Sequence, residues 1–159
     1  MMDGTHDLKV NLHLSQACNF HCRHCFAHFP SKVVLPLHAW KSIIDNLYGS
    51  GMVKFLNFAG GEPLLFPHFF DVFEYAYKKG FTLSIITNGY FLKNPESIPS
   101  RFFQKLSMLG ISVDSTNEDA LKEMGRCDKR GNVLSLAELK HIILSAKKAN
   151  PSIRIKLNT

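Results

Sequence analysis

Segments with the hydrophobic pattern of strands alternate with helical segments along the whole chain, and this alternation restricts the fold more than any other feature. Five segments have the pattern of β-strands, at residues 8–14, 53–59, 82–88, 106–114 and 153–159. Four have the pattern of helices, at residues 36–49, 67–80, 97–106 and 135–151, the third of them short. Strands that alternate with helices predict a parallel sheet, either open or barrel-like. We therefore expect one α/β domain over residues 1–159.

Small or polar residues follow each of the five expected strands. They are Ser15 and Gln16, Gly60 to Glu62, Thr87 to Gly89, Ser112 and Asp114, and Asn158. In parallel α/β sheets the carboxyl ends of the strands lie at one edge, where ligands bind. We therefore expect these residues to meet at one edge of the sheet and to form a ligand site there.

The composition narrows the classes of function. The chain is 45% hydrophobic and 20% charged, as is typical of a globular protein. No stretch approaches the roughly 20 apolar residues of a membrane span, and no secretory signal is visible, so we expect a cytoplasmic protein without a membrane segment. The net charge of +6 suits a nucleic acid, an acidic surface or a phosphorylated small substrate, and charge alone does not choose among them. The basic residues are scattered and do not alternate with aromatic ones, so direct binding to nucleic acid is not expected.

Three of the four cysteines lie in one short segment after the first expected strand. Cys18, Cys22 and Cys25 have the spacing C-x3-C-x2-C, which provides three thiolates from one loop. Three thiolates can bind three irons of a [4Fe-4S] cluster and leave the fourth iron open to a ligand. Zinc is the alternative, with a fourth ligand from His21, His24 or His28. A disulfide is disfavoured because one thiol would stay unpaired, and the isolated Cys127 has the character of an ordinary loop residue.

The sequence resembles the radical S-adenosylmethionine superfamily in two places. One is the cysteine trio after the first strand, and the other is AGGEPLL, residues 59–65, after the second. The resemblance implies a parallel-stranded partial (β/α) barrel in which Cys18, Cys22 and Cys25 hold a [4Fe-4S] cluster. It also implies that S-adenosyl-L-methionine chelates the open iron and is cleaved by one electron to a 5′-deoxyadenosyl radical.

A narrower resemblance is to the viperin-like nucleotide dehydratases of that superfamily. It rests on VNLHLSQACNFHC, VVLPLHAW, GMVKFLNFAGGEP, SIITNG, ISVDS, MGR and IKLN, which lie between residues 10 and 158. The resemblance implies that the enzyme abstracts the 4′ hydrogen of a nucleoside triphosphate (CTP, UTP or GTP) and expels the 3′ hydroxyl as water. The implied product is a 3′-deoxy-3′,4′-didehydro nucleotide. An antiviral role and an external electron donor are implied with it.

The same resemblance assigns roles to individual residues. Seven match cofactor positions: His24, Gly60, Gly61, Glu62, Asn88, Ser112 and Arg126. Gly60 to Glu62 would face the methionine amino group, and His24 would stack on the adenine at a position that is commonly aromatic in the superfamily. Ser112 and Arg126 match contacts to the cofactor carboxylate. Contacts to the nucleotide and its phosphates are assigned to Asn11, Lys54, Lys156 and Asn158.

The first and last expected strands support a ligand site independently of this resemblance. Their polar faces carry Lys9, Asn11 and His13, and Arg154, Lys156 and Asn158. On a flat sheet such a face would simply be solvated. If the sheet curls into a partial barrel with these faces inward, the lumen is cationic and rich in amides, which suits a triphosphate.

The chain departs from the superfamily pattern in its length. A superfamily core has six strands, whereas this chain has about five, so we expect that the C-terminal part of the barrel is missing. No tyrosine of the chain matches the catalytic tyrosine of viperin-like enzymes, and no catalytic residue is assigned. Two other functions stay open: a radical enzyme that modifies a peptide, and a non-catalytic module that binds zinc or a cluster.

Overall fold

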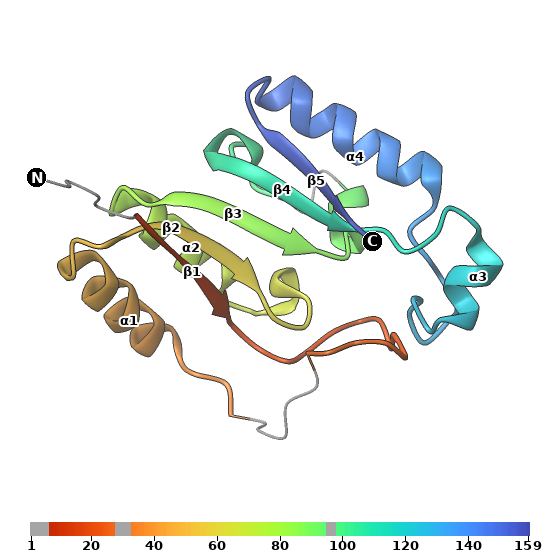
Figure 1. Cartoon of the computed structure of the whole chain (residues 1–159), viewed down its shortest axis with the longest axis horizontal. Helices are drawn as coiled ribbons and strands as arrows, with labels where there is room; N and C mark the ends of the chain where they lie inside the picture. The colour runs from red at the N-terminus through yellow and green to blue at the C-terminus, as the bar shows by residue number, and fades with distance from the viewer. Residues whose placement is uncertain (1–6, 28–32, 95–97) are drawn as a thin grey trace, which may run out of the picture.

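One parallel sheet of five strands organises the molecule (Figure 1). The computed structural model describes residues 7–27, 33–94 and 98–159. The strands are β1 (Leu8–His13), β2 (Val53–Ala59), β3 (Thr82–Thr87), β4 (Leu106–Ser112) and β5 (Arg154–Asn158). They pair in the order β1-β2-β3-β4-β5, and every pair is parallel. The expected α/β class with a parallel sheet is confirmed.

Helices fill the connections between the strands. They are α1 (Leu37–Gly49), α2 (Phe69–Lys78), α3 (Glu118–Glu123) and α4 (Leu136–Ala149), with single 3-10 turns η1 (Pro63–Leu65), η2 (Tyr90–Lys93) and η4 (Phe103–Lys105). A capping box starts α4, in which the Ser135 hydroxyl accepts from the Glu138 backbone and the Glu138 carboxylate accepts from the Ser135 backbone. Within the described ranges, no helix has both the length and the apolar character needed to cross a membrane.

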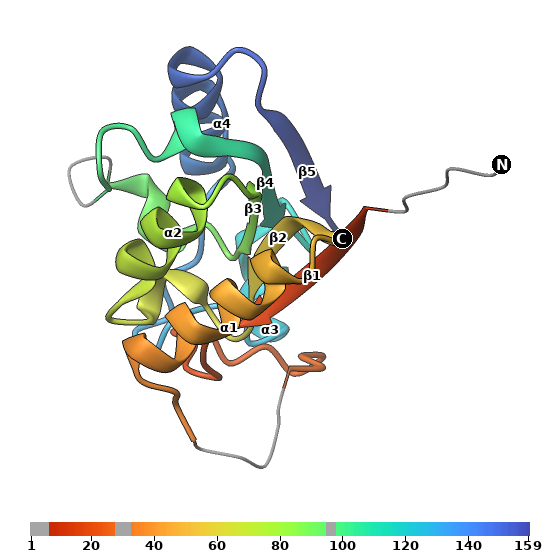
Figure 2. The same ribbon diagram turned by 90° about the vertical axis from the view of Figure 1, so that its left-hand side faces the viewer.

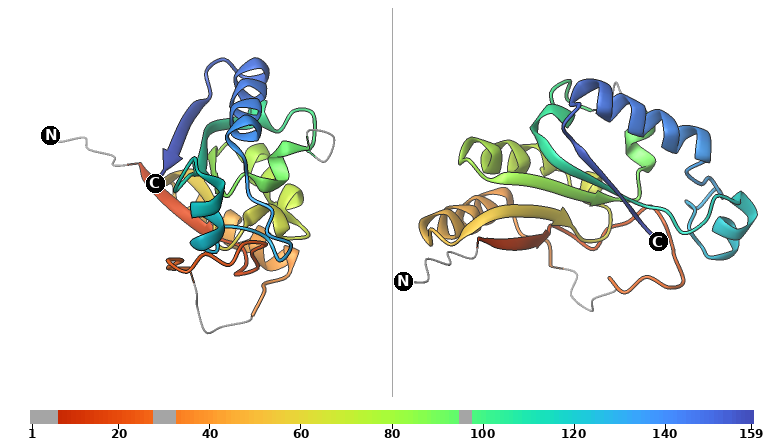
Figure 3. Two further views of the ribbon diagram at one scale, coloured as in Figure 1. Left: turned by 90° about the vertical axis from the view of Figure 1, so that its right-hand side faces the viewer. Right: turned by 45° about the horizontal axis from the view of Figure 1, so that its top comes forward.

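The order of the strands decides which face of the sheet is covered. Right-handed crossovers between neighbouring parallel strands place all crossover helices on the same side. Figures 2 and 3 show α1, α2 and α4 on one side of the sheet, while none of the described helices lies on the opposite side. The side chains alternate accordingly, so that in β1 Leu12 is buried against the helices while Lys9, Asn11 and His13 are exposed. The sheet therefore has an open polar face, as a partial barrel requires.

Aromatic side chains fill the space between the sheet and α2. Phe58 of β2 contacts Phe69 and Phe73 of α2, with ring centroids 5.5 and 5.7 Å apart. Phe102 closes the cluster, with its ring 5.0 Å from that of Phe73. All four rings are almost completely buried. This cluster anchors α2 to the centre of the sheet.

Two local expectations were wrong. Residues 98–106 do not form an α-helix, because the chain turns at Pro99, buries Phe102 and has only the single turn η4 before β4 begins at Leu106. Residue 97, the first of that expected helix, lies outside the described residues. Helix α3 was not expected; it is six residues long and is capped by the Asn117 side chain, which accepts from two backbone amides.

The aromatic cluster allows a test of the core. Phe73→Ala leaves a cavity beneath β2, so we expect the free energy of unfolding to fall by about 3–5 kcal/mol. Tyr77→Ala, on the same helix but 44% exposed in the wild type, is the matched control and should cost less than about 1 kcal/mol. Urea unfolding followed by circular dichroism measures both. Equal losses for the two variants would contradict the assignment of the core.

Candidate functional site

The loops that follow the first two strands are joined through their backbones. The amide of Gly61 donates to the Ser15 carbonyl at 3.0 Å, and the amide of Glu62 donates to the Ala17 carbonyl at 2.7 Å. These bonds continue the pairing of β1 with β2 beyond the ends of both strands. The start of the cysteine loop is thereby fixed directly beside the glycine pair.

This contact is so close that only glycine fits. A Cβ atom on Gly61 would lie 2.3 Å from the Ala17 carbonyl oxygen, and one on Gly60 would lie 2.6 Å from the Ser15 carbonyl oxygen. Gly60 also has a positive φ of 127°. The glycines are therefore required first by the neighbouring backbone of the protein, before any ligand is considered.

Glu62 lies beneath these loops and connects them to the end of β3. Its side chain is fully buried and accepts hydrogen bonds from the Leu64 amide (3.1 Å), the Thr87 hydroxyl (2.8 Å) and the Asn88 amide (2.8 Å). Burial raises the pKa of the carboxyl to about 7, although the three hydrogen bonds lower it. All of these partners belong to the chain itself, so the carboxylate acts here as a connector between the loops.

All four cysteines of the protein are free thiols. In the cysteine loop, hydrogen-bond donors point at the sulfurs: the Phe20 amide lies 3.4 Å and Asn88 Nδ2 3.8 Å from Cys18 Sγ, and Arg126 Nη1 lies 3.8 Å from Cys22 Sγ. Burial raises the pKa of the Cys18 and Cys22 thiols, and these donors partly offset the effect. Donors aimed at sulfur stabilise bound thiolates and tune iron–sulfur clusters. This donor set therefore fits an anionic cluster.

The middle of the cysteine loop is held by the segment after α3. His21 donates its backbone amide to the Gly125 carbonyl at 3.0 Å, and Arg23 donates to the Met124 carbonyl at 2.9 Å. A Cβ on Gly125 would lie 2.4 Å from the His21 carbonyl oxygen. The sequence MGR, residues 124–126, thus supports the loop that carries Cys22.

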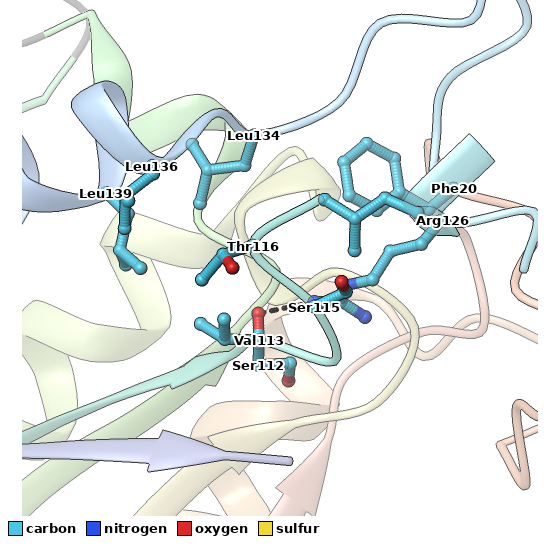
Figure 4. Close-up of a pocket in the computed structure, with 10 residues that line it drawn as sticks. Phe20, Ser112, Val113, Ser115, Thr116, Arg126, Leu134, Leu136 and Leu139 are labelled. Carbon is cyan, nitrogen blue, oxygen red and sulfur yellow. Dashed lines mark hydrogen bonds between the residues drawn. The ribbon is translucent and has the colours of Figure 1, made fainter. Parts of the chain in front are cut away.

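Arg126 connects the same segment to the end of β4 (Figure 4). Its Nη2 donates to the Ser112 carbonyl at 2.6 Å, and its Nη1 lies 2.9 Å from Asp114 Oδ2. That carboxylate is also 3.5 Å from His24 Nε2, so His24 and Arg126 share one partner. Arg126 is only 7% exposed, and its guanidinium lies over the Phe20 ring at 5.8 Å. The loops after β1 and β4 are therefore joined by one charge cluster.

A pocket of about 290 Å³ opens on the polar side of the sheet beneath these loops. Its lining includes Asn11, Gly60, Gly61, Asn88 and Ser112, together with Cys25. Five predicted site residues and one cysteine thus surround a single space. Phe26, beside Cys25, is 88% exposed at this pocket.

Other predicted residues lie elsewhere. Lys156 and Asn158 are on the open face of β5, where Asn158 Nδ2 lies 3.5 Å from the position of a Cβ on Gly110. Lys54 is at a register shift near the start of β2, at the end of the sheet opposite the cysteine loop. Phe55 rather than Lys54 pairs with Lys9. Lys54 is therefore not brought together with the other predicted substrate residues.

Two residues of the site, Asn57 and Ser84, were not among the predicted residues, and the pairing of Asp114 with Arg126 was not predicted either. Asp114 was expected at the ligand edge of the sheet, but a local pattern gave no sign of its partner, because the α3 segment separates the two residues in the sequence. Asn57 and Ser84 are buried polar residues in strand patterns that are otherwise apolar. A polar residue within an apolar strand pattern was the sequence signal that could have marked them as hydrogen-bonded residues of the site.

The thiols do not form a site for a single metal ion. Among residues 7–27, 33–94 and 98–159, no three His, Cys, Asp or Glu side chains converge in that way. His28, one of the possible zinc ligands, lies outside these ranges. The thiolates of a [4Fe-4S] cluster bind separate irons and need not converge on one point.

The comparisons with known proteins agree with this fold. The family model of the radical SAM superfamily matches residues 12–150. The chain therefore belongs to the radical SAM superfamily, whose members use a [4Fe-4S] cluster and S-adenosylmethionine. It is 52% identical over 151 residues to an S-adenosylmethionine-dependent nucleotide dehydratase of Selenomonas ruminantium, covering 95% of this chain and 55% of that protein. A protein of the same description from Pseudoalteromonas ulvae is 30% identical, over 99% of this chain and 56% of its own length.

Solved structures support the architecture alone. Streptococcus suis SuiB bound to its precursor peptide SuiA aligns with 98% of this chain and 33% of its own, at a TM-score of 0.72 and 15% identity. The structure of anSMEcpe with bound AdoMet and a peptide aligns with 94% of this chain and 42% of its own, at 0.67 and 20%. The partial barrel is thereby confirmed. The chain spans about half the length of the curated relatives it matches.

The glycine contact allows a second test. Gly61→Ala places a methyl group 2.3 Å from a carbonyl oxygen, so we expect a loss of roughly 2–4 kcal/mol in the free energy of unfolding. Gly49→Ala is the control, because a Cβ there meets nothing within 4 Å and lies at the end of α1. That change should be neutral or slightly stabilising. Chemical unfolding measures the free energy of unfolding of both variants. No loss in Gly61→Ala would show that the two loops are not in contact.

The buried carboxyl of Glu62 predicts a dependence of stability on pH. The pKa of this carboxyl in the folded state, about 7, lies above the ordinary value of 4.5. Between about pH 4.5 and about pH 7 the folded state therefore retains the Glu62 proton while the unfolded state loses it. The stabilisation from this proton is complete below about pH 4.5 and is lost as the pH rises through about 7. We expect the free energy of unfolding to fall by about 3 kcal/mol between about pH 5 and about pH 8, relative to Glu62→Gln.

Glu62→Gln serves as the reference because it removes the titrating group. The side-chain NH2 group of the new glutamine would face a donor that a carboxylate oxygen accepts from in the wild type. The variant should therefore be less stable at every pH. The quantity to compare is the difference in the free energy of unfolding between the two proteins, measured as a function of pH. Parallel profiles would contradict the raised pKa.

Proposed function

We propose that this chain is the cluster-binding part of a radical SAM nucleotide dehydratase. The observation that carries the proposal is the 52% identity over 95% of the chain to a protein with that description. The open polar face of the sheet, which adjoins three free thiols, supports it. A likeness in fold to peptide-bound enzymes at 15–20% identity does not favour a peptide substrate.

In this proposal Cys18, Cys22 and Cys25 bind the [4Fe-4S] cluster. When bound, the cluster and S-adenosylmethionine supply a reductively generated 5′-deoxyadenosyl radical. The Asn88 amide and the Arg126 guanidinium stabilise the thiolates through their contacts with the sulfurs of Cys18 and Cys22. The raised pKa values of these two thiols mean that cluster binding releases protons and is favoured by higher pH.

The cofactor would lie beside the glycine pair. Gly60 and Gly61 line the pocket and leave its wall free of side chains, while Ser112 and Arg126 offer a hydroxyl and a guanidinium at the end of β4. His24 is about half exposed, and its pairing with Asp114 would hold its ring beside this space. Glu62 contributes indirectly, by fixing the backbone of Asn88 and of the loop after the glycines.

The nucleotide would lie on the open face. Asn11 lines the pocket, and Lys156 and Asn158 stand on the same face at the other edge of the sheet. Amides and a cation suit the hydroxyl groups and phosphates of a nucleoside triphosphate. Lys54 is proposed with less structural support, since it lies at the far end of β2. CTP, UTP and GTP are the candidate substrates, and an external electron donor would reduce the cluster. An antiviral, cytoplasmic enzyme is the corresponding biological proposal.

The test is anaerobic reconstitution followed by incubation with S-adenosylmethionine, dithionite and each nucleoside triphosphate. Mass spectrometry should detect 5′-deoxyadenosine and one nucleotide lighter by a water. Because the chain spans about half of its relatives, we expect slower turnover than that of the Selenomonas relative, assayed in parallel. Cofactor cleavage that ignores every nucleotide, beside an active relative, would oppose a dehydratase function for this chain.

Cysteine variants control this experiment. Cys22→Ser should lose most of the bound iron and sulfide, whereas Cys127→Ser, which lies outside the C-x3-C-x2-C loop, should keep both. Stoichiometric zinc without labile sulfide would instead support the non-catalytic module.

A further inference from the structure

A row of side chains crosses the open face of the sheet one level below the loops. The register aligns Asn11 with Asn57, Asn57 with Ser84, Ser84 with Met108 and Met108 with Arg154, so the row contains one residue from every strand. Asn57 is only 2% exposed and Ser84 only 3%. Burying an amide and a hydroxyl in a sheet costs free energy unless both are hydrogen-bonded.

Three of the polar residues of this row, Asn11, Asn57 and Ser84, form one hydrogen-bonded chain. Ser84 Oγ lies 2.8 Å from Asn57 Oδ1 and 3.4 Å from the Leu56 carbonyl oxygen, so its single hydrogen is best placed toward Asn57. Asn57 Oδ1 then accepts, and its Nδ2 donates to Asn11 Oδ1 at 2.9 Å. In this arrangement the Ser84 hydroxyl donates at one end of the chain, and the side-chain oxygens of both asparagines point toward that end.

The consequence lies at the other end of this chain. Asn11 uses its oxygen to accept from Asn57, which turns its Nδ2 group away from Asn57. Asn11 is exposed and lines the pocket on the open face. No partner of Asn11 Nδ2 occurs among the residues that the structure describes. Asn11 therefore presents a hydrogen-bond donor to the pocket at this point, not an acceptor.

We propose that Ser84 and Asn57 are positioning residues that fix Asn11 as a donor, so that this part of the pocket binds an acceptor oxygen of the ligand. The proposal rests on the proposed function in taking that ligand to be a nucleoside triphosphate. Its acceptor oxygens are those of the phosphates and of the ribose. A ligand group that can only donate is disfavoured at this position, because it would face the amide hydrogens of Asn11.

The orientation can be tested without ligand or activity. In protein labelled with ¹⁵N-asparagine, the side-chain amide hydrogens of Asn57 should exchange slowly with solvent and those of Asn11 rapidly. Asn57→Asp offers only acceptors at position 57, so Asn11 must turn and donate to it, and the Asn11 amide should become protected. In the opposite orientation Asn11 would already donate to Asn57. Protection of Asn11 in the wild type, unchanged by the substitution, would overturn the proposal.

The effect on binding forms the second arm, measured by anaerobic calorimetry on the reconstituted protein. Ser84→Ala and Asn57→Leu release the Asn11 amide without adding charge, and we expect them to raise the Kd of the bound nucleoside triphosphate about 3- to 10-fold. Ser107→Ala is the matched control, because Ser107 is also a strand serine whose hydroxyl donates to a neighbouring strand, at the Leu83 carbonyl, outside this row. It should leave the Kd unchanged.

The choice of ligand shows whether Asn11 binds a phosphate oxygen or a ribose oxygen. It also separates a failure of the positioning role from a failure of the proposed function. A larger effect on tripolyphosphate than on the free nucleoside assigns Asn11 to a phosphate, and the reverse assigns it to the ribose. If the wild-type protein binds none of these ligands, the proposed function fails while the exchange measurement still decides the orientation. If it binds the nucleotide and all variants bind equally well, the positioning role is wrong and the proposed function stands.

Discussion

The backbone contact between residues 15–17 and residues 60–62 is the constraint on which the site depends. It places two loops within hydrogen-bonding distance along their main chains, at a separation that excludes any Cβ. The cysteine loop begins on one side of this contact and the connection to β3, through Glu62, begins on the other. The cysteine loop thereby acquires a fixed base. The same arrangement keeps the wall of the pocket free of side chains, so a structural requirement and a binding requirement are met by the same two glycines.

Much of this arrangement follows from the sequence. The alternation of patterns gave the parallel sheet, and polar residues at the strand ends located the edge where the loops meet. Strand alternation also placed Asn11, Lys156 and Asn158 on one face, because every second side chain points to the same side. Glycine at positions 60 and 61 signalled a close approach, although the approaching group proved to be the backbone of residues 15–17 rather than a ligand alone.

What could not be predicted depends on contacts between distant residues. Lys54 was assigned to the nucleotide by the family resemblance, but a register shift between β1 and β2 puts Phe55 in the row with Lys9. Helix α3 has too few residues for a clear period, and it matters because the residues after it support the cysteine loop. Asn57 and Ser84 were read only as members of strands. Their roles follow from pairing across three strands, which a local pattern does not contain.

The contact between the cysteine loop and residues 124–126 has a consequence for how the protein is made. Cys22 and Arg126 are separated by 104 positions in the sequence, so the thiols leave the ribosome long before their supporting segment exists. Synthesis at about 5–20 residues per second leaves them without that support for several seconds or longer. During this interval the loop is an open chain whose thiols are accessible to oxidants and to competing metals. For a cluster held by these thiols, insertion would therefore be expected late in folding, after the segment that follows β4 has packed against the cysteine loop.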